Sequence, residues 1–184
     1  MGWIQNNWER KINFQYPRAS YINLEEIAHA LSNTCRFNGH CRYFYSVAQH
    51  AVDVAQYIRR SLNGDSAVQL WGLHHDDAEA YLGDMVRPLK YLPEMKAFRQ
   101  MEKRWMALIA EVFGLGWPEP PFVAFADQVL LATEARDLLG IYSYVLPPGV
   151  ELLPELLNLL SPEEAESQYL ALHRKLVAES KEKA

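Results

Sequence analysis

Apolar residues recur along most of this chain at intervals of three or four positions, the spacing of amphipathic helices. Asn23 and Ser46 stand where helix N-caps are expected, and Gly114 where a C-cap is expected. The chain shows no internal repeat, sustained coiled-coil heptad or glycine-rich phosphate loop. The pattern predicts helices over about residues 24–33, 47–58, 65–82, 93–113, 122–140 and 161–177.

Two stretches depart from the helical pattern. Ile12, Phe14 and Tyr16 alternate with polar residues, which predicts a short β-ribbon near the N-terminus. Residues 145–160 are interrupted by prolines and are expected to form irregular chain with short helical pieces. Because 184 residues is an ordinary size for one domain, we predict a single all-α domain over residues 1–184 with a small ribbon.

Composition narrows the class of protein. Hydrophobic residues make up 49% and charged residues 22%, which are globular values, and no apolar run reaches the roughly eighteen residues of a membrane span. The net charge of -5 argues against a non-specific nucleic-acid binder. The N-terminal sequence lacks the pattern of a signal peptide, so a cytoplasmic location is expected. Cys35 and Cys41 form no zinc or disulfide framework and are expected to be reduced thiols.

The densest chemistry lies in the stretch LHHDDAEAYLGDMVRPLK, residues 73–90. If this stretch is helical, His75, Asp76 and Glu79 lie on one wall of the helix, at about 100° per residue. Gly72 falls within the same sector, where a missing side chain is expected to leave room for an ion or a substrate. The alternative is an exposed helix start whose polar residues face water, which is the commoner meaning of an isolated His-Asp pair.

Two other predicted helices offer partners for this pair. His50 stands in the middle of an apolar stripe, where a histidine is more often a hydrogen-bonded core residue than a ligand. Asp127 shares an apolar helix face with Glu134, and a buried carboxylate stays ionised only beside a cation or a hydrogen-bond donor. Together with His75 and Asp76, His50 and Asp127 supply two imidazoles and two carboxylates. Such mixed ligands suit one divalent ion of Mn, Fe, Co, Ni or Zn, and they tolerate Mg.

The motifs SVAQH, LHHDDAEAYLGD, RPLK and FADQVLLATEARDL resemble, in order and spacing, the H...HD...D signature of the HD-domain phosphohydrolases. Within that superfamily the chain is most similar to the bacterial 5'-deoxynucleotidases and their phage-borne relatives, over roughly residues 24–140. The resemblance implies an HD-domain helical bundle in which His74 is a packing residue. It implies as metal ligands His50, His75, Asp76 and Asp127.

The resemblance also implies roles for residues around the ion. Glu79 would serve as general acid or base, and Asp84 would orient the water, a sugar hydroxyl or the leaving oxygen. Arg36 and Lys90 match the phosphate contacts of the family, although without the resemblance both would be interpreted as surface charges. Phe37 offers a stacking face at a position where some relatives have Trp, so this departure leaves the base preference open.

The expected function is therefore metal-dependent hydrolysis of nucleotide phosphate esters, with (deoxy)nucleoside 5'-monophosphates as substrates. One alternative is a deoxynucleoside triphosphate triphosphohydrolase, which would need a pocket long enough for three phosphates. A second is a non-catalytic nucleotide-binding regulatory module with the same fold. We expect a small-molecule nucleotide as the partner, neither a nucleic-acid polymer nor a membrane, and a homo-oligomer with a dimer favoured.

Overall fold

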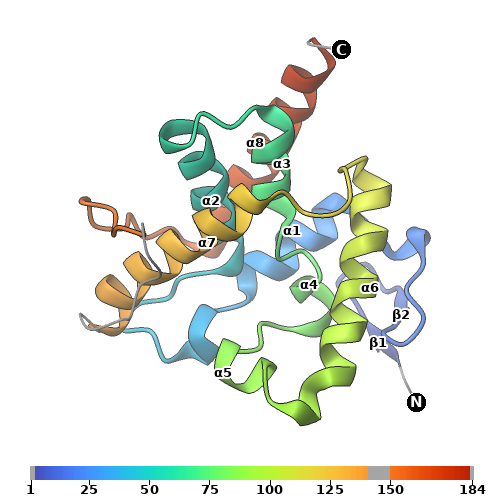
Figure 1. The fold of residues 1–184 in the computed structure, drawn as a ribbon. Helices are drawn as coiled ribbons and strands as arrows, with labels where there is room; N and C mark the ends of the chain where they lie inside the picture. The colour runs from blue at the N-terminus through green and yellow to red at the C-terminus, as the bar shows by residue number, and fades with distance from the viewer. Residues whose placement is uncertain (1–2, 141–149, 183–184) are drawn as a thin grey trace.

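Helices make up most of the protein, which confirms the prediction of an all-α domain with a small N-terminal ribbon (Figure 1). The structure is a computed structural model that describes residues 3–140 and 150–182. The α-helices are α1 (Leu24–Asn33), α2 (Val47–Ser61), α3 (Ser66–His74), α4 (Glu79–Leu82), α5 (Arg87–Lys90), α6 (Lys96–Phe113), α7 (Pro121–Glu134) and α8 (Pro162–Lys181). Shorter helical turns are η1 (Ala19–Tyr21), η2 (Arg36–Gly39), η3 (Pro93–Met95) and the π-helical η4 (Ala135–Leu139).

The ribbon pairs β1 (Trp3–Gln5) with β2 (Lys11–Asn13) in antiparallel register, so that Ile4 lies opposite Ile12. Ile12 is buried in the main core cluster, and Figure 1 shows the ribbon beside α6. The predicted alternation reached Tyr16, yet the strand ends at Asn13 and Tyr16 is exposed. The ribbon is therefore present, but its second strand is shorter than the alternation suggested.

Local capping chemistry fixes where three helices begin. The side chain of Asn23 accepts a hydrogen bond from the backbone N–H of Glu26, and Ser46 accepts one from Gln49. Before α8, Ser161 and Glu164 form a reciprocal capping box. Each cap satisfies a backbone donor that the first turn of a helix leaves unpaired, which is why these starts could be predicted.

Helix α2 is the central element of the core, because it packs against α1, α3, α7 and α8. Its predicted inner stripe is buried throughout, as are the apolar residues that face it. Burying a side chain such as Ile58 contributes roughly 1.5–3 kcal/mol. A helix held on four sides is a rigid base for His50, which α2 carries in the middle of that stripe.

The close approach of α3 to α2 gives Gly72 a different role from the one predicted. A Cβ atom at this position would lie 2.5 Å from Cδ1 of Ile58 and 3.3 Å from Cα of Ala55. Gly72 is therefore required where two helices touch, and it opens no space for an ion or substrate. The expectation of a vacant sector at Gly72 was wrong because the neighbouring helix fills it.

The single helix predicted between the Asn63-Gly64 break and Gly83 is interrupted. Helix α3 ends at His74, residues 75–78 form a turn, and α4 begins at Glu79. In the turn the backbone N–H of Asp77 donates to the carbonyl of His74, three residues earlier, which tightens the chain relative to an α-helix. His75 and Ala78 keep right-handed helical angles, so the pattern of residues still resembles a helix.

Residues 150–160 form an extended segment that contains no helix, so the short helical pieces expected there are absent from the described part. Residues 145–149 of the predicted irregular segment lie outside the described residues. The backbone of Leu153 donates to Thr133, and that of Leu160 to the side chain of Gln49, so the segment is tied to α7 and α2. Among the described helices, none is both long and apolar enough to cross a membrane.

Candidate metal centre

Two imidazole rings meet between α2 and the turn after α3. His50 is fully buried, and its Nδ1 lies 2.5 Å from Oε1 of Glu134. Nδ1 of His75 lies 2.8 Å from the carbonyl oxygen of Gly72, which can only accept a hydrogen bond. In each ring Nδ1 is therefore hydrogen-bonded to another group of the protein, and the two Nε2 atoms face each other at 3.3 Å. This is the usual way in which protein groups orient histidine ligands.

Carboxylates complete the cluster. Oδ2 of Asp76 lies 3.1 Å from Nε2 of His75 and 3.8 Å from Nε2 of His50. Oδ1 of Asp127, from α7, lies 3.3 Å from the same His50 atom. Two neighbouring ligands that each lie about 2.1 Å from one ion are separated by about 3.0–3.4 Å. The spacings His75–Asp76, His50–Asp127 and His50–His75 match this range, and the spacing of 3.8 Å between His50 and Asp76 is wider. His50, His75 and Asp76 therefore form a possible metal-binding triad, with Asp127 beside it.

The charges of the cluster favour a cation. At Asp76 and Asp127 burial raises the carboxyl pKa, but His75 and His50 outweigh burial and hold both pKa values well below the usual range. Burial lowers the pKa of His75, yet Asp76 outweighs it and raises that pKa to about 9. Anionic groups thus dominate the cluster, which attracts a proton and would attract a divalent ion at the same place.

Glu134 organises the site, although the sequence pattern assigned it no role. Its side chain is fully buried, with Oε1 at His50 and Oε2 2.9 Å from Nε of Arg36. Burial raises its pKa, but Arg36 and His50 outweigh burial and lower it. The sequence did contain a sign of this arrangement, because Asp127 and Glu134 stand seven positions apart on one apolar helix face. The partners that explain them lie on other elements and could not be identified from this spacing.

Arg36 is a buried residue of the site, so its interpretation as a surface charge is excluded. It opens η2, its side chain is 9% exposed, and Nη1 lies 3.8 Å from Oδ2 of Asp76. Phe37 follows in the left-handed region with φ 55 and ψ 34, a conformation that costs a bulky residue about 1–3 kcal/mol. Such strain is maintained only where the surroundings enforce it, here on a residue that lines the cavity next to the cluster.

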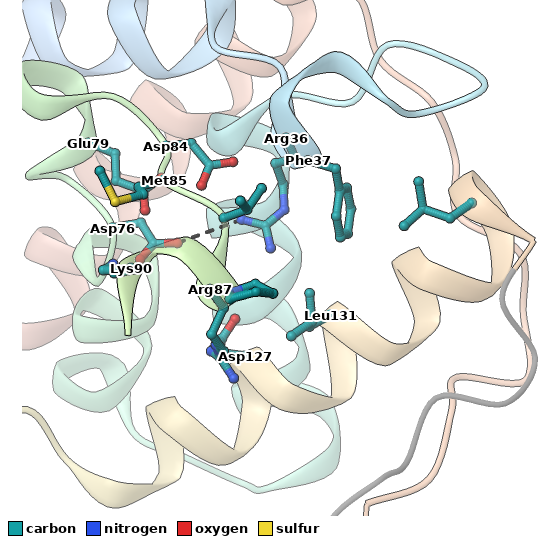
Figure 2. A pocket seen from close by; sticks show the side chains of 13 residues that line it. Arg36, Phe37, Asp76, Glu79, Asp84, Met85, Arg87, Lys90, Asp127 and Leu131 are labelled. Carbon is teal, nitrogen blue, oxygen red and sulfur yellow. Dashed lines mark hydrogen bonds and ion pairs between the residues drawn. The ribbon is translucent and has the colours of Figure 1, made fainter. Parts of the chain in front are cut away.

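Glu79 and Asp84 line the same cavity (Figure 2). Glu79 is buried, and its Oε2 accepts no hydrogen bond among the described residues. Burial raises the pKa of Glu79 well above its ordinary value, and Asp76 and Asp84 add to the shift. Burial also raises the pKa of Asp84, against the opposing effect of Arg36. An unpartnered buried carboxyl beside a cavity is a candidate proton donor.

The cations of α5 are both paired. Lys90 forms an ion pair with Glu102 of α6, at 2.5 Å between Nζ and Oε1. Arg87 places Nη2 2.7 Å from Oδ2 of Asp127. Neither Glu102 nor Arg87 was identified from the sequence, because a pairing between helices leaves no local pattern. Lys90 lines the cavity, with its charge compensated by Glu102. Its expected contact with a phosphate stays a prediction.

The cavity has a charged end and an apolar end (Figure 2). Its volume is about 290 Å³. Arg36, Asp76 and Asp127 face one another at the charged end, and Phe37 and Leu131 lie together farther along (Figure 2). A second cavity of about 320 Å³ opens beside His75 and shares with the first Asp76, Glu79, Arg87, Lys90 and Asp127. The candidate metal-binding cluster therefore lies where two cavities meet.

A second polar cluster lies behind the turn that carries His75 and Asp76. Nδ1 of His74 lies 2.6 Å from Asp77, and its Nε2 lies 2.8 Å from Nδ1 of His173 on α8. The hydroxyl of Tyr169, also on α8, donates to Asp77 at 2.5 Å. Phe113 stacks on the ring of His74. His74 is thus buried, as a packing residue should be, but it is also hydrogen-bonded.

Comparison with known proteins places the chain among relatives. No protein-family model matches it. It is 38% identical over 153 residues to "Uncharacterized protein YfdR" of Escherichia coli (strain K12), covering 81% of each chain. It is 29% identical over 181 residues to "Uncharacterized protein RCAP_rcc00048" of Rhodobacter capsulatus, covering 91% of this chain and 92% of the relative. With 38% identity over most of both chains, the protein belongs to the same family as the Escherichia coli protein YfdR.

Proposed function

We propose that this protein is an HD-domain phosphohydrolase that uses one divalent metal ion to hydrolyse (deoxy)nucleoside 5'-monophosphates to nucleoside and phosphate. The observation that carries the proposal is the junction of an N/O ligand cluster with a cavity that is charged at one end and apolar at the other. A nucleotide has the same division, with a dianionic phosphate at one end and a flat base at the other. The resemblance of the sequence motifs to HD-domain enzymes supports the same assignment.

The ligand atoms fit a divalent ion. His50, His75 and Asp76 would hold it together with Asp127, and mixed imidazole and carboxylate donors suit Mn, Fe, Co, Ni or Zn and tolerate Mg. When bound, such an ion polarises a phosphoryl oxygen and makes water a better nucleophile at neutral pH. Glu134 and the carbonyl of Gly72 hold the two imidazoles in the tautomer that leaves Nε2 free for the ion.

Residues of the charged end handle the phosphate and the proton. Arg36 is fixed by Glu134 and offers its remaining N–H groups to phosphoryl oxygens. Burial raises the pKa of Glu79 well above its ordinary value, which favours its protonated form and suits it to donate a proton to the leaving 5' oxygen. Asp84, on the same cavity, is placed to orient the attacking water or the sugar. Lys90 contributes positive charge, moderated by its pairing with Glu102.

The apolar end is suited to the nucleoside. Phe37 offers an aromatic face, and Leu131 and Leu139 line the cavity around it. The volume of about 290 Å³ lies at the lower limit for small-molecule sites. The size of this cavity favours a monophosphate, because the two further phosphates of a triphosphate would have to extend into the second cavity beside His75.

The test is an incubation of the purified protein with nucleoside mono-, di- and triphosphates, each with Mn, Co or Mg. Phosphate and triphosphate release are measured separately. We expect phosphate release from monophosphates that depends on the metal and is lost on chelation. Release of intact triphosphate with a higher kcat/KM would replace the proposal by a triphosphohydrolase. Nucleotide binding without turnover under any condition would favour a regulatory module.

A further inference from the structure

We propose that Arg87 is a phosphate-binding residue that also holds Asp127 in its orientation toward the metal centre. The inference rests on the proposed function for the identity of the ligand, a terminal phosphate group. It rests on geometry for the contact with Asp127. Arg87 stands in the RPLK motif, but the resemblance assigned it no role.

The two oxygens of Asp127 have separate partners. Oδ1 lies 3.3 Å from Nε2 of His50, inside the ligand cluster, and Oδ2 lies 2.7 Å from Nη2 of Arg87, outside it. A carboxylate free to rotate could exchange its two oxygens or bind an ion through both. The hydrogen bond from Arg87 fixes one oxygen and directs the other at His50. Arg87 thus orients Asp127 through a hydrogen bond, as Glu134 orients the ring of His50.

Among the three cations of the first cavity, Arg87 is the most accessible to an arriving anion. The side chain of Arg36 is 9% exposed and its Nε is bound to Glu134. Lys90 is 21% exposed and paired with Glu102. Arg87 is 50% exposed, and Asp127 is the one carboxylate that it pairs with among the described residues. A guanidinium has five N–H donors, so one contact with Asp127 leaves others for phosphoryl oxygens.

The position of Arg87 in the fold suits this role. It is the first residue of α5 and lines both cavities, which share the residues of the cluster. The far end of α5 has its own attachments, because Lys90 pairs with Glu102 and Arg99 donates to the carbonyls of Lys90 and Leu92. Removing the guanidinium of Arg87 should therefore leave α5 in place.

The substrate class follows from the number of cationic contacts. A phosphate monoester has three terminal oxygens, whereas a phosphodiester has two. The ion, Arg36 and Arg87 would each contact a different terminal oxygen, so a full set of contacts requires a monoester. Arg87 thus makes the site selective for terminal phosphates over the internal phosphates of nucleic-acid chains or cyclic nucleotides.

The experiment compares the parent with Arg87→Gln and Arg87→Ala, and uses Arg60→Gln as the control. Arg60 is an exposed arginine of α2 that lines a different cavity. Binding of Mn and binding of inorganic phosphate to the Mn-loaded protein are measured by calorimetry. KM and kcat are then measured for a nucleoside monophosphate, and hydrolysis of a cyclic nucleotide is measured in parallel.

Arg87→Gln keeps a hydrogen-bond donor for Asp127 but loses the charge. We expect its Mn affinity to stay within about threefold of the parent, and its phosphate affinity to fall at least about tenfold with a matching rise in KM. Arg87→Ala should lose Mn affinity as well, by about 10- to 100-fold. Arg60→Gln should match the parent in every measurement.

Parental phosphate and Mn affinities in both Arg87 variants would overturn the inference, as would a parent protein that binds Mn but no phosphate. A cyclic nucleotide hydrolysed as fast as the monophosphate would overturn the selectivity. The failure of the proposed function is a separate outcome. If the parent binds Mn and phosphate but hydrolyses no nucleotide, the binding measurements on the Arg87 variants still decide the inference.

Discussion

Two histidine clusters lie on opposite sides of one turn and use neighbouring residues of the chain. His75 and Asp76 face the cavity with His50, whereas His74 and Asp77 face α8 and meet His173. The first cluster lies at the junction of two cavities. The second is covered by Phe113 and Tyr169, and its polar atoms bond to one another. The same residue types therefore form a candidate binding site on one side of the turn. On the other side they form a structural joint, a buried hydrogen-bonded cluster that ties the turn to α8.

The balance of carboxylates and imidazoles separates the two clusters further. Three carboxylates, those of Asp76, Asp127 and Glu134, lie beside the two imidazoles of the first cluster. Asp76 raises the pKa of His75 to about 9. One carboxylate serves the two imidazoles of the second. There burial, followed by His74 and Arg174, lowers the pKa of His173 to about 4. The first cluster attracts cations and the second disfavours them, so we expect metal affinity at the first alone.

Removing a ligand should have the largest effect. His75→Ala, Asp76→Ala or Asp127→Ala is expected to abolish hydrolysis and to lower bound metal, because a divalent ion then has fewer ligands that are also less well placed. Elemental analysis and turnover of a monophosphate measure both effects. His29→Ala, at a His–Glu pair between α1 and α8, is the control and should keep metal and activity. Full metal and activity in Asp127→Ala would show that Asp127 is no ligand.

A smaller effect is expected when the proposed proton donor is removed and the proposed metal ligands are kept. Glu79→Gln should retain metal and nucleotide binding and lose about two to four orders of magnitude in kcat, the usual contribution of general acid-base catalysis. Pre-steady-state and steady-state kinetics on the metal-loaded protein measure it. Asp84→Asn tested in parallel assigns the division of roles. An unchanged kcat in Glu79→Gln together with a large loss in Asp84→Asn would transfer proton donation to Asp84.

The second cluster should make the fold sensitive to acid. The pKa of His173 is lowered in the folded state relative to about 6.5 in the unfolded chain, so the unfolded chain binds more protons between these values. The corresponding stability is fully present above about pH 6.5 and is lost as the pH falls toward 4. Because His173 is partly exposed, the loss is expected to be about 1–2 kcal/mol.

His173→Gln tests this sign. Urea unfolding between about pH 7.5 and 4.5 should show a smaller loss of the free energy of unfolding in the variant than in the parent. His29→Gln gives the background for replacing a partly exposed histidine. Equal slopes against pH in His173→Gln and the parent would show that the second cluster does not exclude protons.

The smallest effect is expected from Tyr169→Phe. The change removes the hydroxyl that donates to Asp77 and keeps the ring, so the free energy of unfolding should fall by about 1–2 kcal/mol. Metal affinity should change less than about threefold, because the other bonds of the turn remain. Thermal unfolding and Mn calorimetry measure the two quantities. A large loss of metal affinity without a loss of stability would mean that the structural joint controls the binding site.

Local chemistry explains what the sequence could predict. The caps at Asn23, Ser46 and Ser161 need partners within three residues, so the starts of α1, α2 and α8 were predictable. The residues of the triad and Asp127 were identified from motifs, and α2, α7 and the turn after α3 bring them together. The break after His74 was missed because the turn keeps helical angles at His75 and Ala78.

Contacts between distant elements explain the rest. Glu134 acts on a histidine 84 positions away in sequence, and Arg87 on an aspartate 40 positions away. Nothing in the spacing along one helix indicates such a partner. Gly72 was misinterpreted for the same reason, because the space above a glycine is known only when the neighbouring helix has been placed. Residue types thus predicted which side chains gather at the candidate site, and only packing revealed what holds them.

The contact at Gly72 has a consequence for preorganisation. Since Ile58 and Ala55 leave no space for a Cβ there, backbone contact sets the separation of α2 and α3. The spacing between the two Nε2 atoms is then a property of the polypeptide and does not depend on the ion. An ion that enters such a site finds its ligands already in place, so little conformational entropy is lost on binding. Metal loading should therefore be a fast bimolecular step onto a folded protein, without a refolding phase.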